Sequence, residues 1–260
     1  MSDLASLAEQ LLSLHHGPRP LILPNAWDVA SALAVQRAGA AAIATTSSGV
    51  AESLGYPDGE AIPPGEMFAA VARIAVAVSV PVTADVEAGY GLPYEALVSR
   101  LLRAGAVGLN LEDTDRSGDA PRLGDRDKAA ERIGSIRRAA DAAGVHVVIN
   151  ARVDSFLRGS GVPDERLEDA LKRGIAYREA GADCVYPIWL TDADAIARLV
   201  RELAAPVNVL LRPGAPSVGD LEAMGVRRIS VGAGLAHHTM ARTEQVARQL
   251  IEGDGSAFLA

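Results

Sequence analysis

The sequence predicts an α/β protein of the TIM-barrel class, a single (β/α)8 barrel domain over residues 1–260. Short apolar runs alternate with amphipathic stretches of helical length, and this alternation occurs eight times. Eight such units in 260 residues match the size of a closed barrel better than that of an open doubly wound sheet. Several amphipathic stretches end in the same Ala-Gly-Ala phrase, around Gly39, Gly105 and Gly181. Glycine there supplies the left-handed cap that ends a helix before the next strand.

The individual elements follow in chain order. A helical pattern over residues 1–16 precedes the first strand. Strands are expected near residues 21–23, 41–45, 82–85, 107–111, 146–150, 184–186, 207–210 and 228–231. Between them the clearest helical patterns cover residues 28–37, 94–103, 126–143 and 165–179.

The composition restricts the partners and the compartment. Hydrophobic residues make up 49% of the chain but aromatic residues only 4%, so aliphatic side chains must form the core. A net charge of −8 argues against a nucleic-acid partner, which needs clustered Lys and Arg. No apolar stretch reaches the roughly 20 residues of a membrane span, and no signal peptide is evident. We therefore expect a cytoplasmic protein with no membrane partner. Its single cysteine, Cys184, is expected to be buried and inert.

Two acidic clusters follow neighbouring strands. Asp85 and Glu87 end the third strand, and residues two apart in a strand face the same side. Glu112 ends the fourth strand and is expected beside them. Like charges held so close need a cation, a shared proton or strong hydration. Asp85 could instead cap the next helix while Glu87 is solvated. Three converging carboxylates nevertheless favour a site for Mg²⁺, with Mn²⁺ as an alternative.

Polar residues also follow the second strand. Ser47, Ser48 and Gly49 form a turn whose N–H groups and hydroxyls can bind a carboxylate or phosphate oxygen, although an ordinary turn is the alternative. The connection over residues 52–64 is long for a β/α loop, which is typical of lids and binding loops. Asp58, within it, is a candidate catalytic acid.

A basic residue ends the very apolar fifth strand. Arg152 needs an anionic partner because an unpaired buried charge is costly. Asp154, two residues later, is a candidate for a purely structural partner. The alternative is that Arg152 is catalytic and clamps a substrate oxyanion or carboxylate.

Six motifs occur in a fixed order along the chain. They lie at residues 24–32, 46–51, 55–58, 85–91, 111–113 and 150–154. In this order they resemble the isocitrate lyase/phosphoenolpyruvate mutase superfamily, in the branch of 2-methylisocitrate lyases and oxaloacetate decarboxylases. The resemblance extends from about Leu21 to beyond Gly232 and implies a TIM barrel that binds Mg²⁺ and a small α-keto or α-hydroxy carboxylate.

The resemblance also implies roles for individual residues in substrate binding. Ser47, Ser48 and Gly49 would hold the substrate carboxylate. Arg152 would contact the substrate near the bond that changes, and Asn208, on the seventh strand, would face it.

For the metal, the resemblance implies that Asp85, Glu87 and Glu112 bind Mg²⁺ directly or through water. The shared chemistry is stabilisation of a pyruvate-type enolate while a neighbouring C–C or P–C bond forms or breaks. The metal and Arg152 would stabilise the negative charge as Lewis acid and charge clamp.

The chain departs from the superfamily pattern in the loop after the fourth strand. Lyases of the superfamily carry a Lys-Arg/Lys-Cys-Gly-His sequence there, whereas residues 115–125 contain no Cys, Lys or His. We therefore expect a Mg²⁺-dependent lyase of an oxaloacetate-like acid. One alternative is phosphonopyruvate hydrolase- or phosphoenolpyruvate mutase-like chemistry, with Asp58 or the loop supplying the missing groups. The other is a catalytically silent barrel that binds a keto acid.

The segment from about residue 232 is expected to serve assembly. It contains a helix through Met240 and Leu250 and an apolar tail at Phe258, Leu259 and Ala260. These residues have no evident place in a closed barrel. The resemblance implies that the last helix is swapped between subunits, so we expect a homodimer or homotetramer.

Overall fold

The computed structural model describes residues 2–258 and confirms the predicted barrel. Eight parallel strands overlap the eight predicted runs: β1 (Leu21–Leu23), β2 (Ile43–Ala44), β3 (Val82–Asp85), β4 (Gly108–Glu112), β7 (Val148–Val153), β8 (Cys184–Pro187), β9 (Asn208–Leu210) and β10 (Arg228–Ser230). They form a five-stranded sheet, β2-β3-β4-β7-β8, and a three-stranded sheet, β1-β10-β9. Single bridges from Ala26 to Thr45 and from Val185 to Val207 join the two sheets and close the ring.

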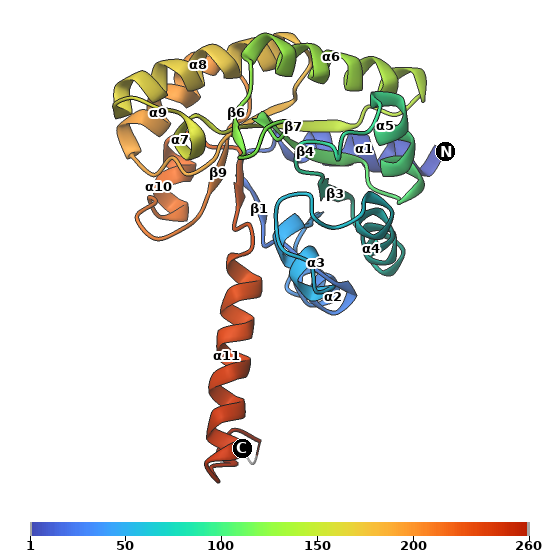
Figure 1. Ribbon diagram of the computed structural model, residues 1–260, viewed down its shortest axis with the longest axis vertical. Helices are drawn as coiled ribbons and strands as arrows, with labels where there is room; N and C mark the ends of the chain where they lie inside the picture. Colours follow the sequence, from blue (N-terminus) through green and yellow to red (C-terminus); the bar gives the residue numbers. More distant parts are fainter. Residues whose placement is uncertain (1, 259–260) are drawn as a thin grey trace.

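Helices cover the outside of most of the ring (Figure 1). They are α2 (Val29–Arg37), α4 (Pro64–Ala77), α5 (Tyr94–Arg103), α6 (Arg126–Ala142), α8 (Pro163–Glu179), α9 (Ala193–Leu203) and α10 (Val218–Ala223). Two shorter helices, α3 (Ser47–Ser53) and α7 (Ser155–Arg158), follow β2 and β7 at the carboxyl-terminal end of the barrel. The glycines that follow α2, α5 and α8 have φ of +97°, +79° and +106°, as expected for left-handed helix caps. One feature was not predicted: β5 (Thr114–Asp115) and β6 (Arg122–Leu123) form an antiparallel hairpin after β4.

The first helix, α1 (Ser2–Leu14), closes the amino-terminal end of the barrel. Its Leu11 is fully buried and lies so close to Gly108 that a Cβ on this glycine would be 2.7 Å from the leucine side chain. Gly108 starts β4, so it allows this close approach where the strand begins. Helix α1 thus packs against the start of β4, and the opposite, carboxyl-terminal end is where a barrel of this class carries its ligand site.

The hydrophobic core is largely aliphatic, as the composition predicts, although Arg228 and Asn150 are also fully buried. Leu109, Ile149 and Val185 are fully buried in three neighbouring strands of the ring. Cys184 is also fully buried, and burial raises the pKa of its thiol to about 12. The thiol is therefore protonated and inert, as expected.

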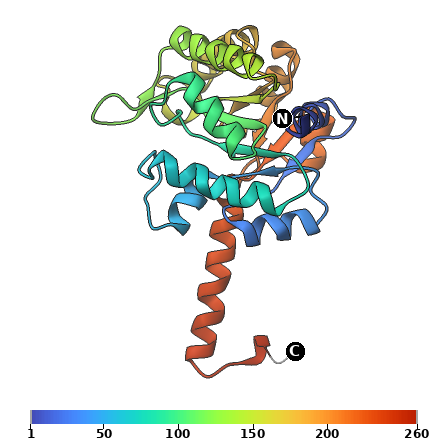
Figure 2. The ribbon, with the colours of Figure 1, turned by 90° about the vertical axis from the view of Figure 1, so that its right-hand side faces the viewer.

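The last helix does not join the helical layer. Helix α11 (Gly234–Ile251) extends away from the barrel in two perpendicular views (Figures 1 and 2). Ala236 is its one buried residue, whereas Met240 is 53% exposed and Ile251 86% exposed. A short 3₁₀ turn, Ser256–Phe258, follows it. The tail residues Leu259 and Ala260 lie outside the described residues. Within residues 2–258, none of the helices combines the length and the apolar character that crossing a membrane requires.

Candidate active site

A cavity of about 520 Å³ opens at the carboxyl-terminal end of the barrel. Every strand of the ring contributes to its lining, either with a residue of its own or with one from the loop that follows. In ring order from β1 these residues include Asn25, Ser47, Asp85, Glu112, Arg152, Tyr186, Arg212 and Ser230. The cavity therefore lies where a TIM barrel carries its active site.

Asp85 is held at the wall of the cavity by the turn after β2. One of its oxygens, Oδ2, accepts hydrogen bonds from the backbone N–H of Ser47 at 3.0 Å and from the Ser47 hydroxyl at 2.7 Å. The Asp85 backbone N–H donates to the Thr45 hydroxyl at 3.0 Å. The first N–H of the serine turn is thus used to orient the aspartate.

Glu87 and Glu112 share an arginine from the β5–β6 hairpin. The Nη2 of Arg116 lies 3.1 Å from Oε2 of Glu87 and 2.7 Å from Oε1 of Glu112. Its Nε is 3.9 Å from a third carboxylate, that of Glu60. Both Glu87 and Glu112 are only 2% exposed, so the guanidinium neutralises charge that water does not reach. Sequence reasoning missed Arg116, although an arginine within an acidic loop beside predicted carboxylates was a usable signal.

Burial, with the nearby charges of Asp85 and Glu112, raises the pKa of Glu87 to about 8. The ion pair with Arg116 opposes this rise. The Tyr90 hydroxyl donates to Glu87 at 3.2 Å, and burial together with the Glu87 charge raises the pKa of Tyr90. Glu60, Glu87 and Tyr90 all have positive φ, between +48° and +63°. Left-handed backbone is costly for such residues and is typically found at functional sites.

Arg152 contacts Asp154, its predicted structural partner, and also Glu112, which was not predicted as a partner. Its Nε and Nη2 donate to Asp154 at 2.7 and 3.0 Å, and its Nη1 forms an ion pair with Glu112 at 2.5 Å. Asp154 also accepts from the Thr114 hydroxyl. The two carboxylates outweigh burial and raise the pKa of the Arg152 guanidinium, which is therefore permanently charged. A guanidinium has five N–H donors, so two remain for a ligand in the cavity.

The other predicted residues lie at different depths. Ser48 and Asp58 line the cavity, Asp58 from the exposed loop at its mouth. Gly49 is buried, and a Cβ there would lie 2.8 Å from Thr46 and 3.0 Å from Trp27, so close packing explains the glycine. Asn208 is fully buried and accepts a hydrogen bond from Ser230 rather than lining the cavity. The structure thus does not place Gly49 or Asn208 against a ligand.

The oxygen donors of Asp85, Glu87 and Glu112 suit a hard cation such as Mg²⁺. Their present arrangement does not: among residues 2–258, no three His, Cys, Asp or Glu side chains are grouped so as to hold a metal ion. Arg116 lies between Glu87 and Glu112 instead. A metal would fit these donors only after Arg116 had moved.

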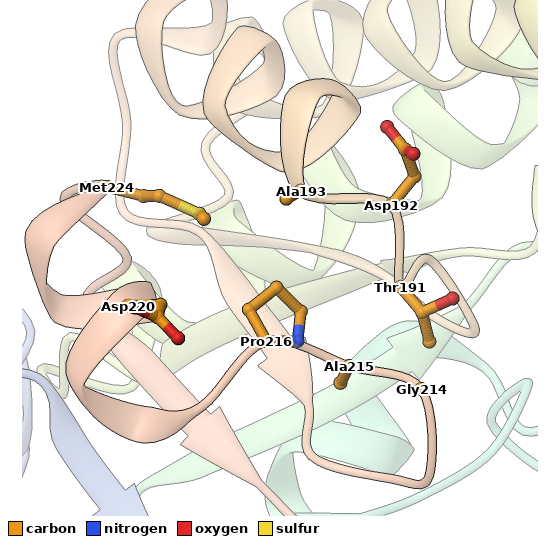
Figure 3. A pocket seen from close by; sticks show the side chains of 8 residues that line it. All are labelled: Thr191, Asp192, Ala193, Gly214, Ala215, Pro216, Asp220 and Met224. Carbon is orange, nitrogen blue, oxygen red and sulfur yellow. The ribbon is translucent and has the colours of Figure 1, made fainter.

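A second hollow lies between the start of α9 and α10 (Figure 3). Its acidic residues serve as helix caps: Asp192 accepts from the backbone N–H of Ala195, and Asp220 accepts from the Ser217 hydroxyl. The barrel mouth, by contrast, gathers charged and polar groups from every strand of the ring, so it is the candidate active site.

Known proteins resemble this chain over most of its length. The family model of phosphoenolpyruvate phosphomutase matches residues 11–251. An uncharacterised protein of Mycobacterium tuberculosis is 38% identical over 221 residues, which cover 85% of this chain and 80% of that protein. The 2-methylisocitrate lyase of Escherichia coli is 32% identical over 200 residues, 73% of this chain and 63% of the enzyme. A solved structure of a protein named as a lyase or mutase, from Burkholderia cenocepacia, is 37% identical to this chain. It matches with a TM-score of 0.89 and covers 98% of this chain and 91% of that one.

Proposed function

Because this chain belongs to the phosphoenolpyruvate phosphomutase family, within the isocitrate lyase/phosphoenolpyruvate mutase superfamily, we propose that it is a Mg²⁺-dependent carbon–carbon lyase. Its substrate is a small α-keto or α-hydroxy carboxylic acid of oxaloacetate type. Relatives named as a 2-methylisocitrate lyase, a 2,3-dimethylmalate lyase and an oxaloacetate decarboxylase support a lyase.

One observation carries this proposal: Arg152 and Glu112 meet at 2.5 Å in the wall of the cavity, beside Asp85 and Glu87. A permanently charged guanidinium thus stands next to carboxylates suited to a hard cation. This pairing of positive charge with metal-binding oxygens suits a reaction in which negative charge develops on a substrate oxygen.

Breaking a C–C bond next to a carbonyl leaves its electron pair as an enolate. The two free N–H donors of Arg152 stabilise the enolate oxygen, while Glu112 and Asp154 hold the guanidinium in place. Asp58, exposed at the mouth, takes a proton from solvent and passes it to the enolate carbon. Ser48, in the first turn of α3, binds the substrate carboxylate.

Asp85, Glu87 and Glu112 would hold Mg²⁺ or Mn²⁺ once Arg116 has left them. Bound there, the metal would supply Lewis-acid stabilisation of the same substrate oxygen. Tyr90 supports Glu87 through its hydroxyl, and its backbone N–H donates to Glu60 at 2.7 Å.

The test measures turnover of oxaloacetate, phosphonopyruvate and methylisocitrate with Mg²⁺ and then with EDTA. We expect metal-dependent turnover of a carbon substrate, and loss of both turnover and Mn²⁺ binding in Asp85→Ala. Asp127→Ala is the matched control, because this carboxylate is 76% exposed and pairs with Arg126 on the outer helix α6. Unchanged turnover in Asp85→Ala would remove the metal from the mechanism. Turnover of phosphonopyruvate alone would replace the lyase with P–C bond chemistry, and binding without any turnover would leave a keto-acid-binding barrel.

A further inference from the structure

An arginine of helix α6 reaches the main chain at both buried glutamates of the site. Arg132 donates from Nη1 to the carbonyl oxygen of Ala88 at 2.8 Å, and from Nη2 to the carbonyl oxygen of Glu112. Ala88 directly follows Glu87, so one planar guanidinium holds the chain beside both glutamates. The Glu112 N–H donates in turn to the Glu87 carbonyl at 2.9 Å. Together these hydrogen bonds fix the segment after β3 against the end of β4.

The segment after β3 needs such a restraint because its backbone is strained. Glu87 has φ of +48° and Tyr90 has φ of +57°. Left-handed backbone is costly for residues with a side chain and persists only where the surroundings enforce it. Arg132 holds the carbonyl of the residue directly after Glu87. It therefore restrains the turn that sets the direction of the Glu87 side chain.

Arg132 does not belong to the wall of the cavity at the barrel mouth. It lines a separate hollow beside the β5–β6 hairpin, together with Asp113, Gly124 and Lys128. Within residues 2–258 it forms no ion pair with a carboxylate, and its Nε is buried without a hydrogen-bond partner. Its guanidinium is thus committed to the two backbone carbonyls, which a charged donor binds more strongly than a neutral one does.

We infer that Arg132 is a positioning residue, which holds Glu87 and Glu112 at the spacing that a divalent cation requires. The inference rests on the proposed function and gives Arg132 a part in metal binding without contact to the metal or the substrate. Groups that orient metal ligands commonly change metal affinity by about ten- to a hundredfold when they are removed. Arg132 differs from Arg116, which contacts the carboxylates themselves and must leave before a metal binds. Arg132 acts through the main chain and stays in place while the metal enters.

The test measures Mn²⁺ binding to the full chain by electron paramagnetic resonance, which requires no turnover. Arg132→Gln loses the charge and the two-pronged contact, so it should weaken Mn²⁺ binding by about tenfold. Arg132→Lys keeps the charge but not the planar fork, so it should recover only part of the affinity. Turnover lost in Arg132→Gln should return at saturating Mn²⁺, because the groups that line the cavity are unchanged.

Arg137→Gln is the matched control for the stability of α6. Arg137 lies on the same helix, donates to the backbone carbonyl of Gly181 at 3.1 Å and pairs with Asp183 at 2.6 Å. It lines neither the cavity nor the hollow beside the hairpin. Its loss should lower the melting temperature at least as much as the loss of Arg132, and it should leave Mn²⁺ binding unchanged.

Three outcomes would overturn the inference. If Arg132→Gln binds Mn²⁺ as tightly as the wild type but melts earlier, Arg132 is a structural anchor. The lyase proposal then still stands, provided that Asp85→Ala abolishes Mn²⁺ binding. Should Arg132→Gln fail to fold, unchanged Mn²⁺ binding in folded Arg132→Lys would have the same meaning. A chain that binds no Mn²⁺, either as the wild type or as Arg116→Gln, would defeat the proposed metal site and the role of Arg132 with it.

Discussion

The two sides of the barrel differ in how completely their groups are paired. On the side of β3, β4 and β7, Arg116 and Arg152 both contact Glu112, and α5, α6 and α8 pack against one another outside. On the side of β9, β10 and β1, Arg212 has no described carboxylate partner, and Ile22 in β1 is 39% exposed. The first side satisfies its charges and its apolar surface internally. The second side leaves a charge and an apolar surface without partners among the described residues.

The largest effect that we expect is on assembly, and it concerns the uncovered outer face of β1. A groove there is lined mainly by apolar residues, including Leu14, Pro18, Ile22 and Val35. Helix α11 follows the eighth strand of the ring, but it extends away from the barrel (Figure 1). We propose that α11 of a second copy covers such apolar surface, which gives a homodimer or homotetramer.

Val246→Asp combined with Leu250→Asp tests this assembly. Both residues lie on one face of α11, in a shallow hollow that also contains Phe258. Charged side chains there should abolish association, because burying them unpaired costs several kcal/mol. Sedimentation should then show monomers or aggregates instead of a uniform oligomer. Arg248→Asp is the control, since Arg248 pairs with Glu244 on the other face. A wild type that sediments as a single chain of 27.0 kDa would contradict the proposal.

The second effect, on catalysis, concerns the side of β3, β4 and β7, where the charges are paired. Arg152→Lys should reduce kcat/KM by about a hundredfold to a thousandfold, because a point charge cannot reproduce a planar, two-pronged contact. The thermal midpoint is measured on the same preparation. Loss of stability with little loss of rate would mean that Arg152 serves only as a partner for Asp154. Arg137→Lys is the control, because Arg137 forms a comparable ion pair with Asp183 at 2.6 Å but does not line the cavity.

The third and smallest effect concerns Arg116. Since its guanidinium lies between Glu87 and Glu112, a metal ion must displace it before binding both. Arg116→Gln should therefore tighten Mn²⁺ binding by about tenfold, equivalent to about 1.4 kcal/mol. Electron paramagnetic resonance measures the free Mn²⁺ directly. Arg122→Gln, in the same hairpin but 60% exposed and paired with Asp115, should change nothing. Weaker Mn²⁺ binding in Arg116→Gln would show that Arg116 supports the metal site instead of competing for it.

Most of the charged residues on the side of β3, β4 and β7 could be predicted from the sequence. Asp85, Glu87 and Glu112 each end or directly follow an apolar run, and parallel strands bring such ends to one edge. The link between Arg152 and Asp154 was one of the two alternatives that the sequence indicated, because residues two apart in an extended strand share a face. What could not be predicted was that Arg152 would contact Glu112 as well, since that depends on the register between β4 and β7.

The positions of residues on the side of β9, β10 and β1 were predicted less well. Asn208 was expected to face the substrate, yet it lies fully buried below the cavity. Its depth depends on the barrel tilt and on the start of β9, and neither can be inferred from a local pattern. The contact between Trp189 and Arg212 joins two loops 23 positions apart in sequence, and no periodicity indicates it.

The sequence by itself determined the eight-unit barrel, the helix-ending glycines and the carboxylates at the strand ends, because alternation, capping and strand polarity are local properties. The tertiary structure alone decided which charges from different strands and loops meet. It placed Arg116 between Glu87 and Glu112, and it left Arg212 against Trp189 without a described carboxylate. The physical reason is that electrostatic pairing depends on distances of a few ångströms between groups far apart in the chain, and these distances exist only once the barrel has closed.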